Sequence, residues 1–347
     1  MRIALVTDAW APQVNGVVRT LQSITALLRR WGHEVLVVSP DQYRSFPCPS
    51  YPEIRLALVS GRSVGGRIER FAPDAVHIAT EGPLGLAARR HCLLRGRPFT
   101  TAYHTHFPDY VAKRTGLPPS LFWSYIRWFH RPSLGIMVAA EGVRRELRGR
   151  GLSRLREWSR GVDLADFAPG LEPPDLYWDL PRPIMLYVGR VSVEKNVEAF
   201  LRCRHEGSKV VVGDGPALAR LRAEFPEARF LGHQSGSELA ACYAGADVLV
   251  FPSRTDTFGL VMIEALACGT PVAAYPVTGP LDVLTPECGA MDEDLDAAIG
   301  RALALDSEAC TAHARGFTWE ASARQFLDAL ACPAEVLARS APLPCAA

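Results

Sequence analysis

The sequence predicts an α/β protein with two domains, each built on a parallel sheet covered by helices. Short apolar runs typical of buried strands alternate with helical patterns along most of the chain. A proline-rich stretch at 167–183 interrupts this alternation once, where neither a helix nor a central strand is tolerated. A length of 347 residues also suits two domains of ordinary size.

The first half begins with a βαβ unit: a strand at 2–7, a loop at 8–16, a helix at 17–31 and a strand at 34–39. Further elements are expected at 75–78 (strand), 84–95 (helix), 99–103 (strand) and 135–139 (strand). The alternation resumes after the prolines. We expect strands at 184–188, 209–212, 230–231, 247–251 and 272–275, and helices at 193–203, 217–225, 237–244 and 260–268. The sequence therefore predicts two Rossmann-like domains, at 1–170 and 171–330, followed by a tail at 331–347.

Composition narrows the class of protein. The chain is 48% hydrophobic and 22% charged, which is typical of a soluble globular protein. Its apolar runs fall far short of the ~20 residues of a membrane span, and its N-terminus lacks the pattern of a signal peptide, so we expect a cytoplasmic protein. Nine cysteines without close pairing fit small buried hydrophobes better than zinc or disulfide sites.

Charge divides unevenly along the chain. Up to Asp175 there are 24 basic and 15 acidic residues, a net charge of +9, and the remainder carries −8. A basic half indicates an anionic partner such as a lipid surface or nucleic acid, although a solvated surface explains the same excess.

The strand-to-helix loops hold the candidate functional residues, because ligands of such sheets bind at the carboxyl ends of the strands. The first loop lacks the G-x-G-x-x-G fingerprint, which disfavours a nicotinamide or flavin cofactor. Its Asn15-Gly16 pair still opens a helix, where backbone N–H groups can approach an anion.

Two cations follow the first strand of the second half. Arg190 comes directly after Gly189, and Lys195 opens the next helix, so together they can clamp a pyrophosphate. Gly213-Asp-Gly-Pro ends the following strand with a tight turn that lets a ring approach the backbone.

The segment 252–271 adds two carboxylates. Asp256 lies in a loop and can reach a sugar, while Glu264 lies in the following helix and can accept both hydroxyls of a ribose. The entrance of that helix is formed by Thr257, Phe258, Gly259 and Leu260, whose free N–H groups suit a phosphate.

With these motifs together, the chain resembles glycosyltransferase family 4, whose members have two Rossmann-like domains facing across a cleft (GT-B). The matching stretches are Val14-Asn-Gly-Val, His104-Thr-His-Phe-Pro-Asp-Tyr, Arg160-Gly-Val-Asp, Gly189-Arg-x3-Glu-Lys-Asn, Gly213-Asp-Gly-Pro and 252–271. The sub-pattern is similar to bacterial GDP-mannose-dependent lipid mannosyltransferases and sulfoquinovosyl-diacylglycerol synthases. The helix at 318–330 resembles the family's C-terminal helix, which packs back across the cleft.

The resemblance implies roles for individual residues. Arg190 and Lys195 would hold the donor diphosphate, and Glu264 would bind the ribose. Asp256, where the family usually has Glu, would hold the donor sugar with the N–H groups of Phe258 and Gly259. On the opposite domain, Asn15 and Gly16 would approach the diphosphate, and His104 would lie beside the reacting carbon.

The implied function is a retaining, metal-independent hexosyltransferase. Its donor would be GDP-mannose or a UDP-hexose, used as substrate, and no cofactor is expected. The acceptor would be a membrane lipid such as diacylglycerol. A non-catalytic nucleotide-sugar or nucleic-acid binding protein on the same fold is the alternative, although no RNA-binding signature appears. Two sequence patterns could also indicate a metal site, but each has a structural explanation. His104 and His106 lack a recognisable third ligand, and Asp292-Glu-Asp294 is better explained as the start of a helix.

Arginine clusters in the basic half suggest peripheral binding at the inner face of the cell membrane. The apolar residues Leu147, Leu152, Leu155 and Trp158 interleave with the last cluster, as in a basic amphipathic segment lying on a surface. The clusters comprise Arg62, Arg67 and Arg70, then Arg89, Arg90, Arg95 and Arg97, then Arg144, Arg145, Arg148, Arg150, Arg154 and Arg156.

Overall fold

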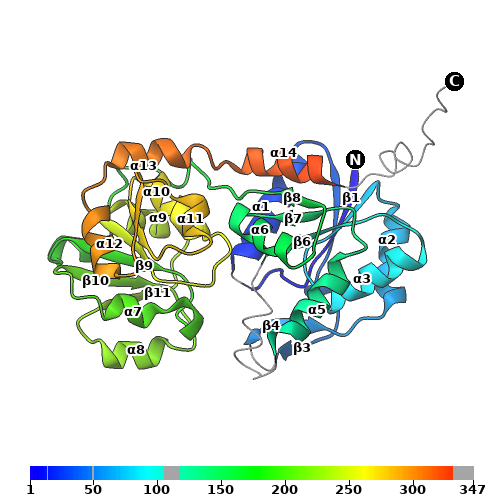
Figure 1. Cartoon of the computed structure of the whole chain (residues 1–347), viewed down its shortest axis with the longest axis horizontal. Coiled ribbons are helices and arrows are strands. Elements are labelled where there is room, and N and C mark those ends of the chain that lie inside the picture. Colours follow the sequence, from blue (N-terminus) through cyan, green and yellow to red (C-terminus); the bar gives the residue numbers. More distant parts are fainter. Residues whose placement is uncertain (14, 49–50, 105–117, 331–347) are drawn as a thin grey trace. The chain divides into compact units, whose positions relative to one another are not determined.

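The computed structural model describes residues 1–13, 15–48, 51–104 and 118–330 (Figure 1). The chain divides into two compact units. The first contains Met1–Ser159 together with the C-terminal part of the chain from Glu320, and the second contains Arg160–Trp319. In the described residues, no helix combines the length and the apolar character needed to cross a membrane.

The first unit contains a six-stranded parallel sheet in the order β2-β1-β5-β6-β7-β8 and an antiparallel pair β3-β4. Its strands are β1 (Arg2–Val6), β2 (Glu34–Val38), β3 (Ser45–Cys48), β4 (Tyr51–Ala57), β5 (Ala75–Ile78), β6 (Thr100–Tyr103), β7 (Ile136–Val138) and β8 (Leu155–Glu157). Its helices are α1 (Gly16–Arg30), the 3-10 turn η1 (Pro40–Gln42), α2 (Gly61–Phe71), α3 (Pro83–Leu94), α5 (Pro119–His130), α6 (Glu141–Gly149) and α14 (Trp319–Ala329).

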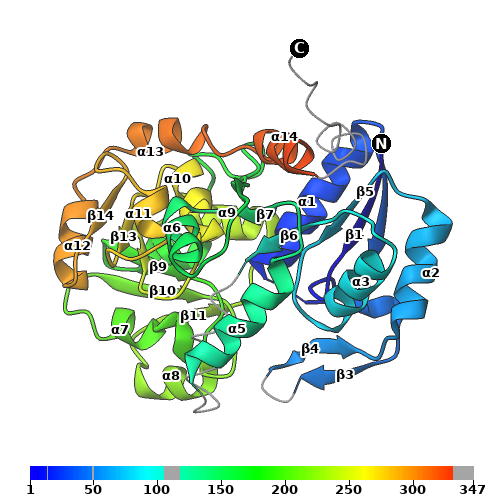
Figure 2. The ribbon, with the colours of Figure 1, turned by 45° about the vertical axis from the view of Figure 1, so that its right-hand side comes forward.

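Helices cover both faces of this sheet. Alternate strand residues such as Val76 and Ile78 pack under α2, α3 and α5, and the same face continues under α6. His77 points to the opposite face, where its ring lies 5.0 Å from that of Phe326 on α14. Trp158, which is fully buried, meets Phe326 at 5.1 Å. Both views show α14 close to α1, and an Arg30–Glu320 ion pair of 3.1 Å joins them (Figures 1 and 2). The last helix is thus part of the first unit's core.

The second unit contains a six-stranded parallel sheet in the order β11-β10-β9-β12-β13-β14. This is the doubly wound order in which the first strand lies beside the fourth. Its strands are β9 (Ile184–Val188), β10 (Ser208–Val212), β11 (Arg229–Gly232), β12 (Val248–Phe251), β13 (Val272–Ala274) and β14 (Gly289–Met291). Its helices are η2 (Asp175–Asp179), η3 (Val193–Lys195), α7 (Val197–Leu201), α8 (Leu218–Glu224), α9 (Gly236–Ala244), α10 (Leu260–Ala267), α11 (Pro280–Val283), α12 (Leu295–Ala302) and α13 (Ser307–Ala314).

The core of the second unit lies between its sheet and α7, α8 and α12, where Val250 and Phe200 are fully buried. Helices α9 and α13 both pack on α10 (Figure 1). The predicted two parallel-sheet halves are therefore confirmed. The cysteine interpretation holds for six cysteines whose burial the structure describes, which are buried and free: Cys92, Cys203, Cys242, Cys268, Cys288 and Cys310.

One predicted helix is wrong. The expected helix at 193–203 is broken at Asn196, whose φ of 55° is left-handed and separates η3 from α7. Its side-chain Nδ2 donates to the carbonyl of Pro252 at 3.2 Å, so a tertiary hydrogen bond holds this local break. Asparagine tolerates the left-handed region better than most residues.

Asp8 joins the two strands at the switch point of the first sheet, where β1 lies beside β5. Helix α3 begins after Gly82, which has no side chain to cap it. The Asp8 carboxylate fills this role by accepting from the backbone N–H of Leu84 at 2.9 Å and the hydroxyl of Thr80 at 2.9 Å. Burial nevertheless dominates and raises the pKa of Asp8 to about 6.

The shifted pKa of Asp8 makes folding stability depend on pH. Because its folded pKa lies above the ordinary 3.8, ionisation above about pH 6 weakens the fold, and wild type gains stability as pH falls toward 4. We expect Asp8→Asn to lose this gain, so that the difference in free energy of unfolding between the two proteins changes by up to about 3 kcal/mol. Urea unfolding of both proteins at pH 4.5 and 7.5 measures this change. If the difference in free energy of unfolding between the two proteins is the same at both pH values, the raised pKa of Asp8 is contradicted.

Candidate active site

The predicted donor-binding residues of the second unit gather at the carboxyl ends of β9 and β12. These neighbouring strands mark the switch point of the sheet, where open α/β sheets bind their ligands. Residues 189–196 follow β9, and residues 252–259 follow β12. Both groups therefore lie at one edge of the sheet, as the sequence predicted, and their binding of a donor stays a prediction.

Two side chains tie these loops together. The Lys195 ammonium donates to Oδ1 of Asp256 in a short ion pair, and Asn196 bonds Pro252 as described above. The side chains of Lys195 and Asp256 remain 28% and 23% exposed, so both charges are accessible at the surface of the unit. Lys195 and Asp256 were predicted to bind different parts of the donor, and the structure shows that they also bind each other.

Arg190 is positioned by a residue that the sequence analysis missed. The Tyr187 hydroxyl, at the end of β9, donates to the backbone carbonyl of Arg190 at 2.7 Å. Burial, reinforced by the nearby negative charges of Asp256 and Glu194, raises the pKa of Tyr187 well above its usual value. The phenol thus stays protonated and holds the loop. No spacing rule singles out a tyrosine inside a buried strand.

The glycines of the 213–215 turn have a packing role, and the predicted approach of a ring to this turn stays a prediction. A Cβ added to Gly213 would lie 1.9 Å from the carbonyl oxygen of Gly189, and one on Gly215 would lie 2.5 Å from that of Val191. Both have positive φ, at 136° and 155°. The turn therefore needs glycine so that the loops after β9 and β10 can pack backbone against backbone.

The entrance of α10 is built as the sequence indicates. Leu260 is the first helical residue, and Gly259 precedes it with a φ of 88°. Phe258 is buried, and its ring meets that of Phe317 at 5.9 Å. Thr257 is half-buried in the same loop. The ring of Phe258 is therefore a packing anchor, and the sugar contact of its backbone N–H group stays a prediction.

Glu264 is almost completely buried in the second unit. Only 3% of its surface is exposed, and its Oε2 accepts a hydrogen bond of 2.9 Å from Tyr243 on α9. Tyr243 is a second positioning residue that the sequence analysis missed. The bond fixes the carboxylate in the second turn of α10 and satisfies part of its need for donors.

The predicted residues of the first unit also follow strands. Asn15 caps α1, because its Oδ1 accepts from the N–H groups of Val17 and Val18 at 3.0 Å each. Gly16 is the exposed first residue of α1. His104 follows β6, and its half-buried ring lies 5.5 Å from that of Trp158. His106 lies outside the described residues.

The structure tests two further predictions about charged segments, the helix start at 292–294 and the basic amphipathic segment. Asp294 is the N-cap of α12, and its Oδ1 accepts from Asp296 N at 3.1 Å, which confirms the helix start. The basic amphipathic segment is wrong. Leu147, Leu152 and Trp158 are buried in the first unit, so they offer no apolar face to a membrane.

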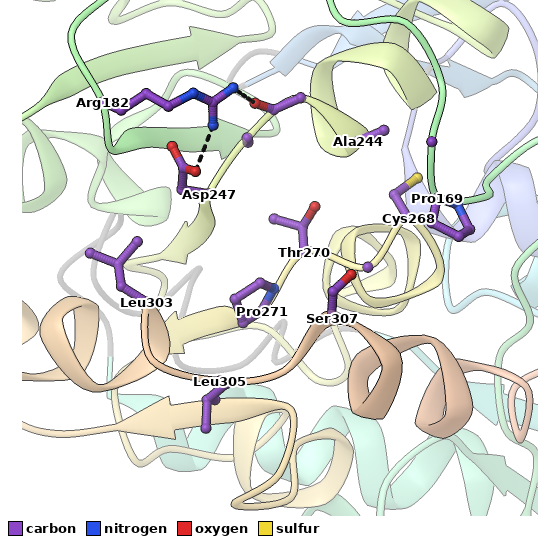
Figure 3. Close-up of a pocket in the computed structure, with 14 residues that line it drawn as sticks. Pro169, Arg182, Ala244, Asp247, Cys268, Thr270, Pro271, Leu303, Leu305 and Ser307 are labelled. Carbon is purple, nitrogen blue, oxygen red and sulfur yellow. Dashed lines mark hydrogen bonds and ion pairs between the residues drawn. The ribbon is translucent and has the colours of Figure 1, made fainter.

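A pocket of about 310 Å³ in the second unit lies away from the predicted residues (Figure 3). Its lining includes Arg182, Asp247 and Pro271, which precede β9, β12 and β13 and so mark the amino-terminal edge of the sheet. Arg182 donates to Asp247 at 2.6 Å and to the carbonyl of Gly245 at 3.2 Å. The pocket is therefore no part of the candidate active site.

Comparisons with known proteins agree with this geometry. Residues 14–166 match the model of Glycosyltransferase Family 4, and residues 182–305 match that of Glycosyl transferases group 1. A GDP-mannose-dependent alpha-mannosyltransferase of Mycobacterium tuberculosis is 33% identical over 82% of each chain. The sulfoquinovosyl transferase SQD2 of Arabidopsis thaliana is 32% identical over 78% of this chain and 58% of its own. An alpha-monoglucosyldiacylglycerol synthase of Streptococcus pneumoniae is 28% identical over 79% and 71%.

Solved structures share the architecture. Sucrose-phosphate synthase from Thermosynechococcus elongatus has a TM-score of 0.77 at 21% identity, covering 98% of this chain and 100% of that one. Anabaena HepE in complex with UDP and glucose has a TM-score of 0.67 at 15% identity, covering 97% and 99%. With its two doubly wound sheets, its matching motifs and these relatives, the chain belongs to glycosyltransferase family 4 and has the GT-B fold.

Proposed function

We propose that this glycosyltransferase moves a hexose from a nucleotide-diphosphate sugar to a hydroxyl group of a membrane lipid, with retention of configuration and without a metal ion. The observation that carries the proposal is the joining of the loops after β9 and β12. Lys195 and Asp256 meet there, and Tyr187 anchors the backbone of Arg190. A cation clamp for phosphate and a carboxylate for sugar hydroxyls thus share one sheet edge.

In the proposed reaction the bond between the sugar's anomeric carbon and the donor phosphate breaks, and the diphosphate leaves with the electron pair. The acceptor oxygen bonds the anomeric carbon on the face that the diphosphate leaves, and its proton passes to the departing phosphate. Lys195 and Arg190 stabilise the negative charge that grows on the diphosphate. Because Lys195 is fixed before the reaction, little reorganisation is needed at that step.

The proposed donors are GDP-mannose and UDP-hexoses. The relatives named above include a GDP-mannose-dependent mannosyltransferase and a glucosyldiacylglycerol synthase, which support a hexose and a lipid acceptor. Glu264 would accept from the ribose hydroxyls while Tyr243 holds its second oxygen. Asp256, one methylene shorter than the family's usual Glu, would contact the sugar.

Thermal stabilisation by a panel of UDP, GDP and ADP sugars tests the donor class. In buffer with EDTA we expect one nucleotide to give a saturable rise in Tm, because a ligand that binds only the folded state stabilises it. Turnover of that donor is then followed with lipid acceptors. Stabilisation without turnover would favour a non-catalytic binding protein, and activity that requires Mg²⁺ would contradict metal independence.

Lys195→Ala tests the cation clamp. Removing the ammonium should lower kcat by on the order of 10²-fold or more, since a preorganised charge acts mainly on the transition state. Arg229→Ala, which removes an exposed cation of the same unit, is the matched control and should leave kcat unchanged. A loss of less than about threefold for Lys195→Ala would overturn the assignment.

We also propose that the first unit contacts an anionic membrane through α3 and α5. Four large apolar side chains are exposed there: Leu93 at 46%, Leu94 at 76%, Leu121 at 57% and Trp128 at 52%. The two helices touch, since the Arg89 guanidinium lies 3.8 Å from the centre of the Trp128 ring. Exposed cations on these helices or directly after them are Arg90, Arg95, Arg127 and Arg131. Apolar side chains rimmed by arginine suit the boundary between anionic headgroups and acyl chains.

Vesicle sedimentation tests this surface. We expect binding to phosphatidylglycerol vesicles that falls in high salt, and several-fold weaker binding of the double variant Leu121→Ser/Trp128→Ser. Leu281→Ser, an exposed leucine of the second unit, serves as the control. Equal binding to neutral phosphatidylcholine vesicles, or full binding by the double variant, would argue against it.

A further inference from the structure

A second pocket lies in the first unit, at the carboxyl ends of β1 and β2. Its volume is about 260 Å³, below the ~300–1,000 Å³ of pockets for drug-sized ligands, so it suits one small ring. It is lined by Trp10, Ala11, Pro12, Gln13, Pro40, Asp41, Tyr43, Ser45 and Arg55. The β1 end is fixed to β2 by a hydrogen bond of 3.0 Å from Thr7 N to Val38 O. This is the sheet edge at which α/β folds bind ligands.

The pocket is held by local hydrogen bonds. Gln13 N donates to Trp10 O at 3.1 Å, and the buried Gln13 side chain donates to Asp8 O at 3.2 Å, so the turn carrying Trp10 is fixed at both ends. Tyr43 is half-buried against the core, with the Arg67 guanidinium 5.8 Å from its ring centre. Two aromatic rings are therefore placed by the fold.

Polar groups of the pocket retain bonding capacity. The Arg55 guanidinium uses two of its five N–H donors on Ser45, to the backbone carbonyl at 2.7 Å and to the hydroxyl at 3.2 Å, and the other three have no partner among the residues that the structure describes. The buried Tyr43 hydroxyl has no hydrogen-bond partner among the described residues, which is unfavourable unless a ligand or water supplies one. Asp41 is exposed and adds two acceptor oxygens.

From these features we infer that the pocket binds a cyclic polyol, either a pyranose or an inositol ring, carried by the lipid acceptor. Such a ring has apolar C–H faces that suit Trp10 and Tyr43, and a rim of hydroxyls that suits Asp41 and Arg55. The inference rests on the proposed function and deepens it, because the acceptor then already carries a polar ring and is more than bare diacylglycerol.

The residues proposed to bind the donor are different from those that line this pocket. The residues proposed for the donor's diphosphate, ribose and sugar lie mainly in the second unit, at Arg190, Lys195, Asp256 and Glu264. In the first unit the proposed donor contacts, Asn15 and Gly16, come later in the same loop that carries Trp10. A ring held by Trp10 is thus close in the chain to the helix start that approaches the diphosphate.

Saturation-transfer NMR on the full chain tests the pocket with three soluble probes: methyl α-D-glucopyranoside, myo-inositol and glycerol. We expect signal for one of the two rings and at most about one third of it for glycerol, with a loss of at least about threefold in Trp10→Ala. Tyr43→Phe, a variant that keeps the aromatic ring, should also weaken the signal. Trp178→Ala, at an exposed tryptophan of the second unit, should leave it unchanged. The ring that responds distinguishes a glycosylated lipid from an inositol lipid.

Turnover provides the second readout. With monoglucosyldiacylglycerol, phosphatidylinositol and diacylglycerol as acceptors, Trp10→Ala should raise the KM for the ring-bearing acceptor about tenfold and leave the donor KM within about twofold. Equal probe signals for glycerol and the rings, or an undiminished signal in Trp10→Ala, would overturn the inference. If no nucleotide sugar raises the Tm of the wild-type protein, that result would instead count against the proposed function, because the Tm shift reports on donor binding by the second unit.

Discussion

The candidate active site depends on one joint between two loops. Lys195 and Asn196 are adjacent in sequence, yet both bond the loop after β12, one through a charge and the other through an amide. The left-handed backbone at Asn196 makes this possible, because it ends η3 and lets α7 start in a new direction. Without this joint the charged groups after β9 and β12 would be held only by their own loops, and the predicted clamp would lose its fixed geometry.

Much of the architecture could be predicted from the sequence, because parallel strands that are buried on both faces consist of continuous apolar residues. The order of such runs and helices is enough to predict two doubly wound sheets, and the loops after β9 and β12 could be assigned to the functional edge. The pairing of Lys195 with Asp256, 61 residues apart, could not be predicted, since no local pattern encodes it.

The residues that sequence reasoning missed share a physical character. Tyr187 and Tyr243 are buried, and each uses its hydroxyl to fix another group, the Arg190 carbonyl in one case and the Glu264 carboxylate in the other. Inside an apolar run, a tyrosine looks like any other core residue. One arginine of the predicted clusters is also used inside the fold. Arg89 is 7% exposed, and its guanidinium donates to the carbonyls of Trp128 and Phe129, so part of the positive charge is used inside the unit.

The return of the chain to the first unit has a consequence for synthesis on the ribosome. Every strand of the first sheet has been made by residue 157, but the helix that covers His77 and Trp158 begins only at Trp319. During translation of the whole second unit, that aromatic surface has no α14 to cover it. Folding from the N-terminus can therefore complete the second unit before the first, and the nascent first unit is the part that needs protection from aggregation.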